Sequence, residues 1–215
     1  MKESDAEQIL NQAGAVITNS HIVYTSFKHG TVYIDKDAVY PDTEATSALC
    51  HAIAERFEDS NVEAVVAPEK GGIILSQWVA FHLSQMTKRK VLAFYAEKTD
   101  DGSFNFVIKR RSAQVKLPGK NVLVVEDILT TGGSARKVIE VTRALGAIVV
   151  GLGVICNRGG VKREDVADVP RLEALLNVQL DAWNETDCLL CKDGVPINTD
   201  VGKGREFLAG QRQQT

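Results

Sequence analysis

The sequence has few cysteines, little net charge and no long apolar run, and each shortage excludes a class of protein. Four cysteines in 215 residues are too few for a scaffold held together by disulfides. A net charge of -3 argues against charge-driven binding to nucleic acids or membranes. No apolar run approaches the length of a membrane span, and the charged start MKESDAEQIL lacks the apolar core of a signal peptide. We therefore expect a cytoplasmic protein with no nucleic-acid or membrane partner.

The remaining composition is that of an ordinary globular protein. Hydrophobic residues make up 44% and charged residues 25% of the chain. A chain of this length is long enough for one α/β domain with a sizeable core. We see neither an internal repeat nor a low-complexity linker, so we expect residues 1–215 to form a single domain.

The most informative segment is Val122–Ser134, which reads VLVVEDILTTGGS. Its first four residues are apolar without alternation, which is typical of a strand buried on both faces. Two carboxylates, Glu126 and Asp127, follow where we expect the strand to leave the sheet. The small residues Thr130–Ser134 then lead into Ala135–Leu145, where apolar residues recur near helical spacing. Free N–H groups and the positive dipole end at such a helix start suit a phosphate monoester, while the carboxylates suit hydroxyl groups or a metal.

Two other phosphate-binding motifs are excluded. The chain has no G-x-x-x-x-G-K-[ST], so this loop is not a Walker A motif. No G-x-G-x-x-G follows a strand, since Gly151 and Gly153 lie inside an apolar run. An ordinary solvent-facing turn is the alternative, but the complete order of apolar run, acidic pair and hydroxyl-glycine loop favours a phosphorylated sugar as the ligand.

Apolar runs alternate with amphipathic segments along the chain, which predicts an α/β fold with a parallel central sheet covered by helices. The expected strands are His21–Tyr24, Thr31–Asp35, Ala64–Ala67, Val91–Ala96, Phe104–Ile108, Val122–Val125 and Ile148–Ile155. The expected helices are Ser4–Ala13 (capped by Ser4 with Glu7), Pro41–Phe57, Gly71–Leu83 and Ala135–Leu145. Residues 1–40 and about 171–215 are expected to contribute a small cap.

Ligands of such sheets bind at the carboxyl ends of the strands, so the residues directly after each strand are candidates for binding. After the first core strand, Glu69, Lys70 and Gly71 open a helix and form a second candidate anion site; a plain turn with a surface lysine is the alternative. The next strand leads into the polar segment Glu97–Ser103, which is either a lid that excludes water or an exposed hairpin tip. After the last one, Arg158 stands beside glycines and offers a planar fork for a carboxylate or imide.

The motif resembles the 5-phosphoribosyl-1-pyrophosphate (PRPP) site of type I phosphoribosyltransferases. The resemblance implies that Glu126 and Asp127 hold the ribose 2- and 3-hydroxyls while the following loop wraps the 5-phosphate. That loop comprises Ile128, Leu129, Thr130, Thr131, Gly132, Gly133 and Ser134. The resemblance also implies that Lys70, with Glu69 and Gly71, contacts the pyrophosphate, that Mg²⁺ binds through PRPP, and that the protein is a homodimer.

Nearly the whole chain most resembles the orotate phosphoribosyltransferases. The segment Tyr24–Gly30, followed by Tyr33, is similar to a strand-turn-strand that forms part of their base pocket. Phe27 stands where the family has glycine. The resemblance implies that Lys28 and Arg158 supply cations to orotate, with Phe27 and Tyr33 in the same pocket.

The segment Tyr95–Gly102 departs from the usual lid because it retains Lys98 but lacks an arginine and a histidine. It resembles a shorter-lid branch whose tail also carries the Cys-x-x-Cys and Gly-Val-Pro found here within Cys188–Pro196. The resemblance implies that Lys98 acts in catalysis together with the acidic pair. The basic residues beyond the hairpin are either replacements for the missing lid charge or a solvated cluster; they are Lys109, Arg110 and Arg111.

Cys188 and Cys191 are half the ligand set of a structural zinc site, and no second ligand pair lies near them in the sequence. Reduced structural thiols are therefore favoured, because a metal site would need ligands from elsewhere in the chain or from a second subunit. Among the histidines, His29 lies in the base-pocket turn and is only a weak candidate for a functional role.

Two classes of function remain. The favoured one is an enzyme that transfers the 5-phosphoribosyl group from PRPP to orotate, giving orotidine 5-phosphate and pyrophosphate, with a purine or another base as the alternative acceptor. The other is a PRPP-sensing regulator without chemistry. Such regulators usually carry a DNA-binding module, and no basic helix-turn-helix segment is visible in this sequence.

Overall fold

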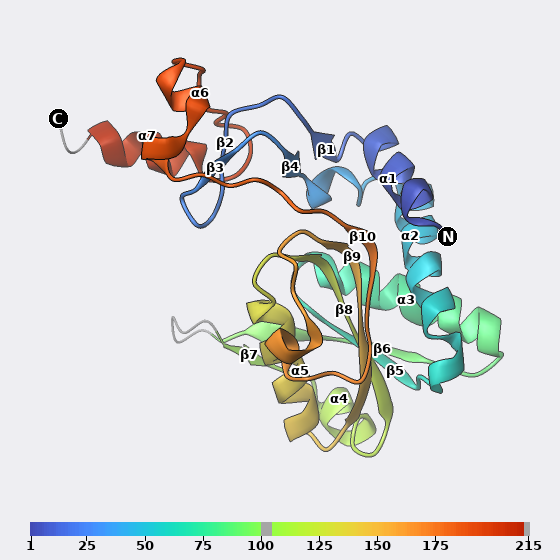
Figure 1. Cartoon of the computed structure of the whole chain (residues 1–215). Helices are drawn as coiled ribbons and strands as arrows, with labels where there is room; N and C mark the ends of the chain where they lie inside the picture. Colours follow the sequence, from blue (N-terminus) through green and yellow to red (C-terminus); the bar gives the residue numbers. More distant parts are fainter. Residues whose placement is uncertain (100–104, 213–215) are drawn as a thin grey trace.

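The computed structural model describes residues 1–99 and 105–212. Its centre is a six-stranded sheet in the order β10-β9-β8-β5-β6-β7, parallel except for the antiparallel pair β6–β7 (Figure 1). The strands are β5 (Ala64–Pro68), β6 (Leu92–Lys98), β7 (Phe106–Val107), β8 (Asn121–Leu129), β9 (Ile148–Asn157) and β10 (Leu172–Asn177). The expected α/β class, with a mostly parallel central sheet flanked by helices, is confirmed.

Helices cover both faces of the sheet, and this explains the unbroken apolar runs of the central strands. The neighbours Leu123 and Val124 on β8 are both fully buried but belong to separate core clusters on opposite faces. One face packs against α1 (Glu3–Gln12), α2 (Thr43–Arg56) and α3 (Gly71–Thr87), and the other against α4 (Arg111–Lys116) and α5 (Gly133–Ala144). The short 3-10 helices are η1 (Lys36–Ala38), η2 (Glu58–Ser60), η3 (Arg163–Val166) and η4 (Glu185–Asp187).

A small cap lies beyond the carboxyl ends of the strands, at the top of Figure 1. It joins an N-terminal segment to the C-terminal tail through isolated bridges between His21 and Ile197 and between His29 and Trp183. Its elements are β1 (Val16–Ile17), β2 (Ile22–Val23), β3 (His29–Gly30), β4 (Tyr33–Ile34), α6 (Leu189–Lys192) and α7 (Gly204–Arg212).

Several boundaries differ from those that the sequence indicated. Helix α1 has Lys2 as its N-cap, because the Asp5 carboxylate accepts the Lys2 N–H at 3.0 Å, so the expected cap at Ser4 with Glu7 is wrong. The motif strand continues to Leu129 instead of ending before the acidic pair. The sequence indicated the end of the strand from the end of its apolar run. Pairing with β9 keeps the residues after that run extended.

Other differences arise from pairing between distant segments. The expected strands around residues 21–24 and 31–35 do not form one hairpin; β2 pairs with β3, and β4 pairs with β1. Strand β10 pairs in parallel with β9, so residues 172–177 lie in the central sheet and the tail joins the cap only after Asn177. The polar segment after Ala96 starts as part of β6, and its residues 100–103 lie outside the described residues. No helix in the described ranges is long and apolar enough to cross a membrane.

Candidate active site

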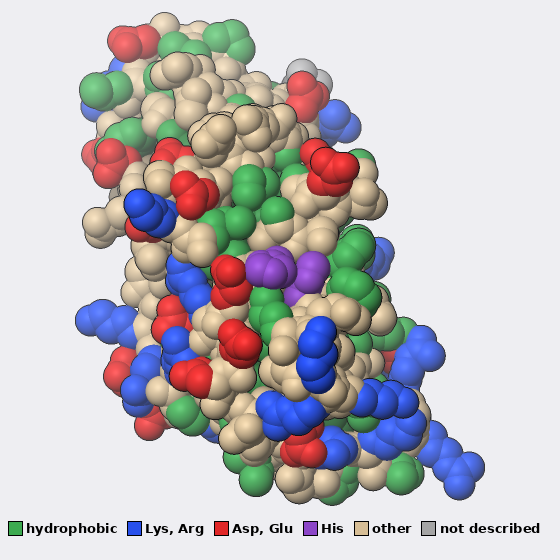
Figure 2. Space-filling model, turned by 90° about the vertical axis from the view of Figure 1, so that its right-hand side faces the viewer, with side chains coloured by type: hydrophobic (Ala, Val, Ile, Leu, Met, Phe, Trp, Pro, Cys, Tyr) green, Lys and Arg blue, Asp and Glu red, His purple; other side chains and the backbone are tan. Residues whose placement is uncertain are grey.

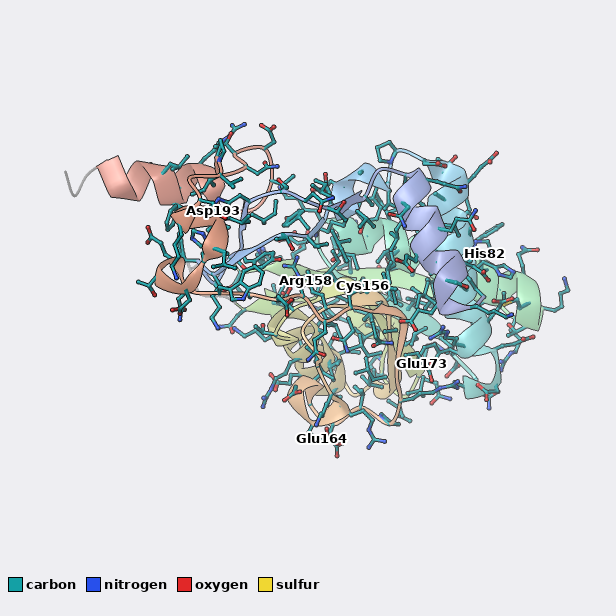
Figure 3. All side chains as sticks on the ribbon, turned by 45° about the horizontal axis from the view of Figure 1, so that its top comes forward. His82, Cys156, Arg158, Glu164, Glu173 and Asp193 are labelled. Carbon is teal, nitrogen blue, oxygen red and sulfur yellow. The ribbon has the colours of Figure 1, made fainter. Side chains whose placement is uncertain are left out.

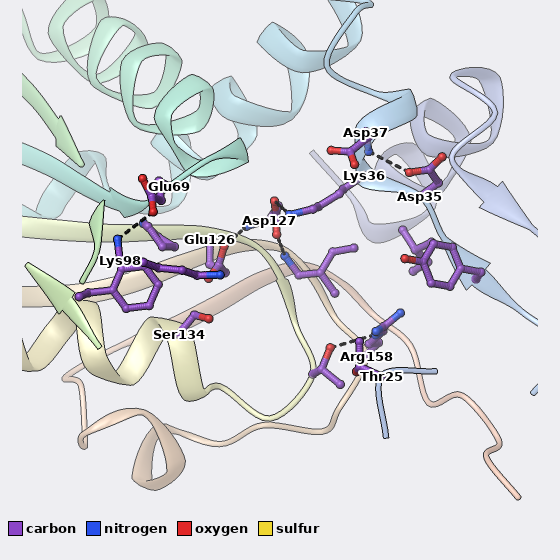
Figure 4. Close-up of a pocket in the computed structure, with 16 residues that line it drawn as sticks. Thr25, Asp35, Lys36, Asp37, Glu69, Lys98, Glu126, Asp127, Ser134 and Arg158 are labelled. Atoms are coloured by element: carbon purple, nitrogen blue, oxygen red, sulfur yellow. Dashed lines mark hydrogen bonds and ion pairs between the residues drawn. The ribbon is translucent and has the colours of Figure 1, made fainter. Parts of the chain in front are cut away.

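A cavity of about 360 Å³ lies at the carboxyl ends of β5, β6, β8 and β9, where the cap faces the sheet (Figure 4). Many of the residues singled out in the sequence line this cavity: Tyr33, Glu69, Lys98, Glu126, Asp127, Ile128, Thr130, Ser134 and Arg158. The lining also includes residues that were not singled out in the sequence as site residues: Thr25, Ile34, Asp35, Lys36, Asp37, Pro68 and Phe106. Parallel strands bring these segments to one edge although they are distant in sequence.

The acidic residue Asp127 is held in place by two side chains from the segment that follows β4. Lys36 Nζ lies 2.8 Å from Oδ2, and the Tyr40 hydroxyl donates to the same oxygen at 2.9 Å. The other oxygen accepts the N–H of Ile128 at 2.7 Å. Burial would lower the pKa of Lys36, yet the Asp127 carboxylate raises it above its usual value. The charged run directly after β4, Asp35 to Asp37, is the one sequence signal that could have identified this lysine.

Glu126 has a different environment from its neighbour. It is buried, and its Oε1 accepts the Asp127 N–H at 3.1 Å. Burial, followed by repulsion from the Asp127 carboxylate, raises the pKa of Glu126 well above its usual value. The two neighbouring carboxyl groups therefore differ, because Asp127 is paired with Lys36 whereas Glu126 is buried in an environment that disfavours its charged form.

The raised pKa of Glu126 predicts how stability changes with pH. The folded protein holds this proton more tightly than the unfolded chain, so the stabilisation is complete below about pH 4.3, the ordinary glutamate pKa. It is lost as pH rises towards the raised pKa. We expect the unfolding free energy of Glu126→Gln, relative to the wild type, to increase with pH in urea titrations between about pH 5 and pH 8. Glu140→Gln, at an exposed site, is the control, and a relative stability of Glu126→Gln that falls with pH would contradict the assignment.

The segment Thr130–Ser134 includes the connection from β8 to α5 and the first two residues of that helix, and it borders a groove of about 130 Å³. Gly132 is the N-cap of α5 with φ 74°, a conformation that glycine adopts without strain. A Cβ atom at this position would also lie 2.7 Å from Val166 Cγ1. The first N–H groups of α5 have no partner within the helix, which makes this groove suitable for a phosphate group. The structure thus brings together around this groove all seven loop residues, Ile128 to Ser134, that the motif indicated.

The second candidate anion loop is arranged differently from the expectation. Glu69 lines the cavity, and its Oε1 accepts the Lys98 N–H at 2.8 Å. Lys70 is exposed and does not line the cavity. Gly71 begins α3 directly beside the acidic pair, where an added Cβ would lie 2.7 Å from Asp127 Oδ2. The absence of a side chain at Gly71 is what allows α3 to approach this carboxylate.

Arg158 lies between the sheet and the cap (Figure 3). Its N–H donates to the Leu129 carbonyl at 3.0 Å and its Nε donates to Thr130 Oγ1 at 3.1 Å. The guanidinium carbon is 5.7 Å from the ring centroids of both Tyr24 and Tyr33. A Cβ at Gly159 would overlap the Thr130 carbonyl oxygen, so only glycine permits this close approach.

A second cavity, of about 110 Å³, adjoins Arg158 on the cap side. It is lined by Tyr24, Thr25, Ser26, Thr130, Arg158, Leu180 and Ala182. The proposed base-side residues Phe27 and Lys28 are exposed and line neither this cavity nor the larger one. Phe27 has φ 58°, a left-handed conformation that favours glycine, so this turn strains the residue that occupies it. Arg110 donates to the Tyr95 hydroxyl, outside the larger cavity.

The fold and the strand-end cavity define the class of type I phosphoribosyltransferases. The family model for the phosphoribosyl transferase domain matches residues 30–185, and the chain belongs to this family. Within it, the orotate phosphoribosyltransferase of Desulforamulus reducens is 36% identical over 91% of this chain and 95% of its own length. That of Thermotoga maritima is 35% identical over 92% and 98%, respectively. This similarity over nearly complete chains places the protein in the orotate phosphoribosyltransferase family.

Solved structures confirm the fold but do not distinguish the base. Orotate phosphoribosyltransferase from Aeropyrum pernix has a TM-score of 0.60 at 23% identity, covering 80% of this chain and 93% of that one. Adenine phosphoribosyltransferase from Saccharomyces cerevisiae also has a TM-score of 0.60, at 21% identity, covering 80% and 99%. The shared fold therefore supports a phosphoribosyltransferase scaffold, and the preference for orotate has to be argued from the base-side residues and the sequence relatives.

Proposed function

We propose that this protein transfers the 5-phosphoribosyl group of PRPP to orotate, releasing pyrophosphate and forming orotidine 5-phosphate. The observation that carries the proposal is the position of Arg158, which the Thr130 hydroxyl holds between the phosphate loop and two tyrosine rings. A planar guanidinium can pair with the carboxylate of orotate and stack on its ring, which an ammonium group cannot do. The names of the sequence relatives support the same base.

The residues divide the work by position. The loop Thr130–Ser134 binds the 5-phosphate, and the acidic pair beside it binds the ribose 2- and 3-hydroxyls. The bond between C1 and the pyrophosphate oxygen breaks first, and its electron pair leaves with the pyrophosphate. The nitrogen of deprotonated orotate then donates its electron pair to C1 from the opposite face. The protein contributes mainly by orienting the two substrates and stabilising the charge that develops.

We propose that Mg²⁺ accompanies PRPP into this cavity. The lining is rich in carboxylate oxygens, the ligands that Mg²⁺ prefers, from Asp35, Asp37 and Glu69 in addition to the acidic pair. Because Lys36 and Tyr40 already engage Asp127, PRPP oxygens would supply most of the ligands. When bound, the ion neutralises charge on the departing pyrophosphate. Pyrophosphate release that is unaffected by EDTA would contradict this role.

The function is tested by measuring pyrophosphate release from PRPP with orotate, uracil, adenine, guanine, hypoxanthine and xanthine in parallel. We expect release with orotate only. Release with a purine would retain the PRPP site and reassign the base pocket, as the shared fold of the adenine enzyme permits. PRPP binding without release for any base would instead favour a PRPP-sensing regulator.

Lys98 is expected to stabilise the departing pyrophosphate, because it lines the cavity at the carboxyl end of β6. Lys98→Ala should lower kcat by about 10²-fold while changing the Kd for PRPP much less, since charge on the leaving group develops only in the transition state. Lys90→Ala, an exposed lysine before the opposite end of the same strand, is the control. Equal losses in turnover and PRPP binding would refute the assignment.

We also propose that the protein is a homodimer that acts in the cytoplasm. Helix α3 exposes Ile73, Ile74 and Phe81, and Figure 2 shows hydrophobic side chains around histidines on the face formed by α2 and α3. All four cysteines are free thiols, which suits a reducing compartment. Phe81→Glu should shift the sedimentation coefficient from dimer to monomer, and a wild-type protein that sediments as a monomer would exclude the dimer.

A further inference from the structure

Four side chains that have no part in the proposed transfer reaction meet in the cap: His21, His29, Cys188 and Cys191. One potential ligand atom of each lies within 4.8 Å of all the others. His21 directly precedes β2, His29 begins β3, and the two cysteines stand at the start and within the single turn of α6. The first three are buried and Cys191 is partly buried. We propose that these residues form a structural zinc site.

The distances among the four ligand atoms agree with tetrahedral coordination. Zn–N bonds of about 2.0–2.1 Å and Zn–S bonds of about 2.3 Å require edges of about 3.3 Å between two nitrogens and about 3.6 Å between nitrogen and sulfur. His21 Nε2 lies 3.6 Å from each cysteine sulfur. His29 Nδ1 lies 3.3 Å from Cys191 Sγ and 2.9 Å from His21 Nε2. Only small side-chain shifts would bring a zinc ion within bonding distance of all four atoms.

The tautomer of His21 is determined by its other ring nitrogen. Nδ1 lies 2.7 Å from the Val195 carbonyl oxygen. Because a carbonyl only accepts, Nδ1 carries the hydrogen and neutral His21 presents the lone pair of Nε2 to His29 and both sulfurs. Histidines that bind metals are oriented in this way, with the distal N–H donated to a carbonyl or carboxylate. The Val195 carbonyl therefore orients the His21 ring so that Nε2 can bind a metal.

A metal would supply cohesion that the cap otherwise lacks. The cap strands contain two residues each, and α6 contains four. Modules with so little core commonly depend on a bound metal or disulfides for their folding free energy. His21 and Cys188 are 167 positions apart in the sequence, so the cluster would tie the N-terminal hairpin to the C-terminal tail.

The ligand set selects the metal. Two thiolates and two imidazoles in a tetrahedron favour Zn²⁺, and four protein ligands leave no open position for a substrate. The site is therefore structural. A disulfide between Cys188 and Cys191 would remove two of the ligands, but both are free thiols here.

The zinc site lies behind the wall of the smaller cavity, a consequence that rests on the proposed function. His29 exchanges backbone hydrogen bonds of 2.8 and 2.9 Å with Trp183, which follows the cavity residue Ala182. On the other side, Lys28 accepts the N–H of the cavity residue Tyr24 at 2.8 Å. Loss of zinc should consequently raise KM for orotate while leaving the Kd for PRPP, which is bound mainly by the sheet edge, nearly unchanged.

The direct test is the zinc content of the full-length protein by plasma mass spectrometry after purification under reducing conditions. We expect about one zinc per chain in the wild type. Cys191→Ser and His29→Gln should lose the ion, whereas Cys50→Ala, at a buried cysteine in the main core, should retain it. Wild-type protein with fully reduced thiols and no zinc, even after incubation with excess Zn²⁺, would overturn the proposal, as would an iron–sulfur cluster.

A second measurement covers variants that fail to fold. Wild-type protein is freed of metal by a chelator under native conditions and titrated with Co²⁺. Tetrahedral Co²⁺ bound to two thiolates gives intense visible bands and a sulfur-to-metal charge-transfer band, and stoichiometric Zn²⁺ should remove both. The absence of these bands would contradict the site. Neither readout depends on turnover, so failure of the zinc proposal is distinguishable from failure of the proposed function.

Discussion

Asp127→Asn should reduce kcat/KM for PRPP by about 10²- to 10³-fold, because it neutralises the carboxylate that receives both Lys36 and Tyr40. Hydrogen bonds to a charged group contribute about 1.5–3 kcal/mol each. The variant weakens those that orient the residue and the one proposed to the ribose. In addition, an amide can turn its NH₂ group towards the Lys36 ammonium group, so that two donors face each other. Pyrophosphate release at varied PRPP concentration measures the effect.

The control for Asp127→Asn is Asp59→Asn, which removes an exposed carboxylate paired with Arg171 and should leave activity unchanged. Thermal unfolding of both variants distinguishes loss of the site from loss of the fold. An Asp127→Asn protein with wild-type kcat/KM would show that this carboxylate does not contact the ribose. Reduced activity with unchanged PRPP binding would instead place its contribution in the transition state.

The second large effect is expected on the base side. Arg158→Lys should lower kcat/KM for orotate by about 10²-fold, since lysine retains the positive charge but loses the planar fork. It also loses Nε, which donates to Thr130, and the position over the rings of Tyr24 and Tyr33. The Kd for PRPP, measured calorimetrically without a base, should change little because the phosphate groove does not include Arg158.

Arg163→Lys is the matched control for Arg158→Lys, because Arg163 is an exposed arginine on η3 that forms an ion pair with Asp168. We expect its kinetics to equal those of the wild type. If Arg158→Lys weakened PRPP binding as much as orotate use, the arginine would serve the phosphate site and not the base. If neither changed, the pocket for the base would lie elsewhere in the cap.

Sequence reasoning reached the parts of the site that are continuous in the chain. The stretch Val122–Ser134 contains its own strand, acidic pair, phosphate loop and helix start, so its chemistry could be inferred before the fold was known. Arg158 could be predicted in the same way, because an arginine beside glycines directly after an apolar strand offers a planar fork for a carboxylate. Strand types were equally accessible, because burial on both faces imposes unbroken apolar runs.

Residues whose role depends on partners distant in the sequence could not be predicted. Tyr40 lies 87 positions before Asp127 and Lys36 lies further still, and the charged run around Lys36 does not indicate which carboxylate it pairs with. Lys70 was predicted to bind an anion because it stands beside glycines at the start of a helix. In the structure its side chain is exposed and does not line the cavity. The two-residue cap strands are too short to carry a periodic pattern, so the sequence could not indicate that β4 pairs with β1 and β2 with β3.

The two cysteines and two histidines of the proposed zinc site illustrate the difference between what can be predicted from the sequence and what cannot. The amino-acid sequence was sufficient to show that Cys188 and Cys191 are spaced as a ligand pair, to predict an α/β protein, and to identify one loop that suits a phosphorylated sugar. The approach of His21 and His29 to those cysteines, and the pairing of Lys36 with Asp127, became evident in the folded chain. Hydrophobic periodicity and loop chemistry act over a few residues and can be read locally. Contacts between side chains that are distant in sequence form only when the chain folds, so no local sequence pattern predicts them.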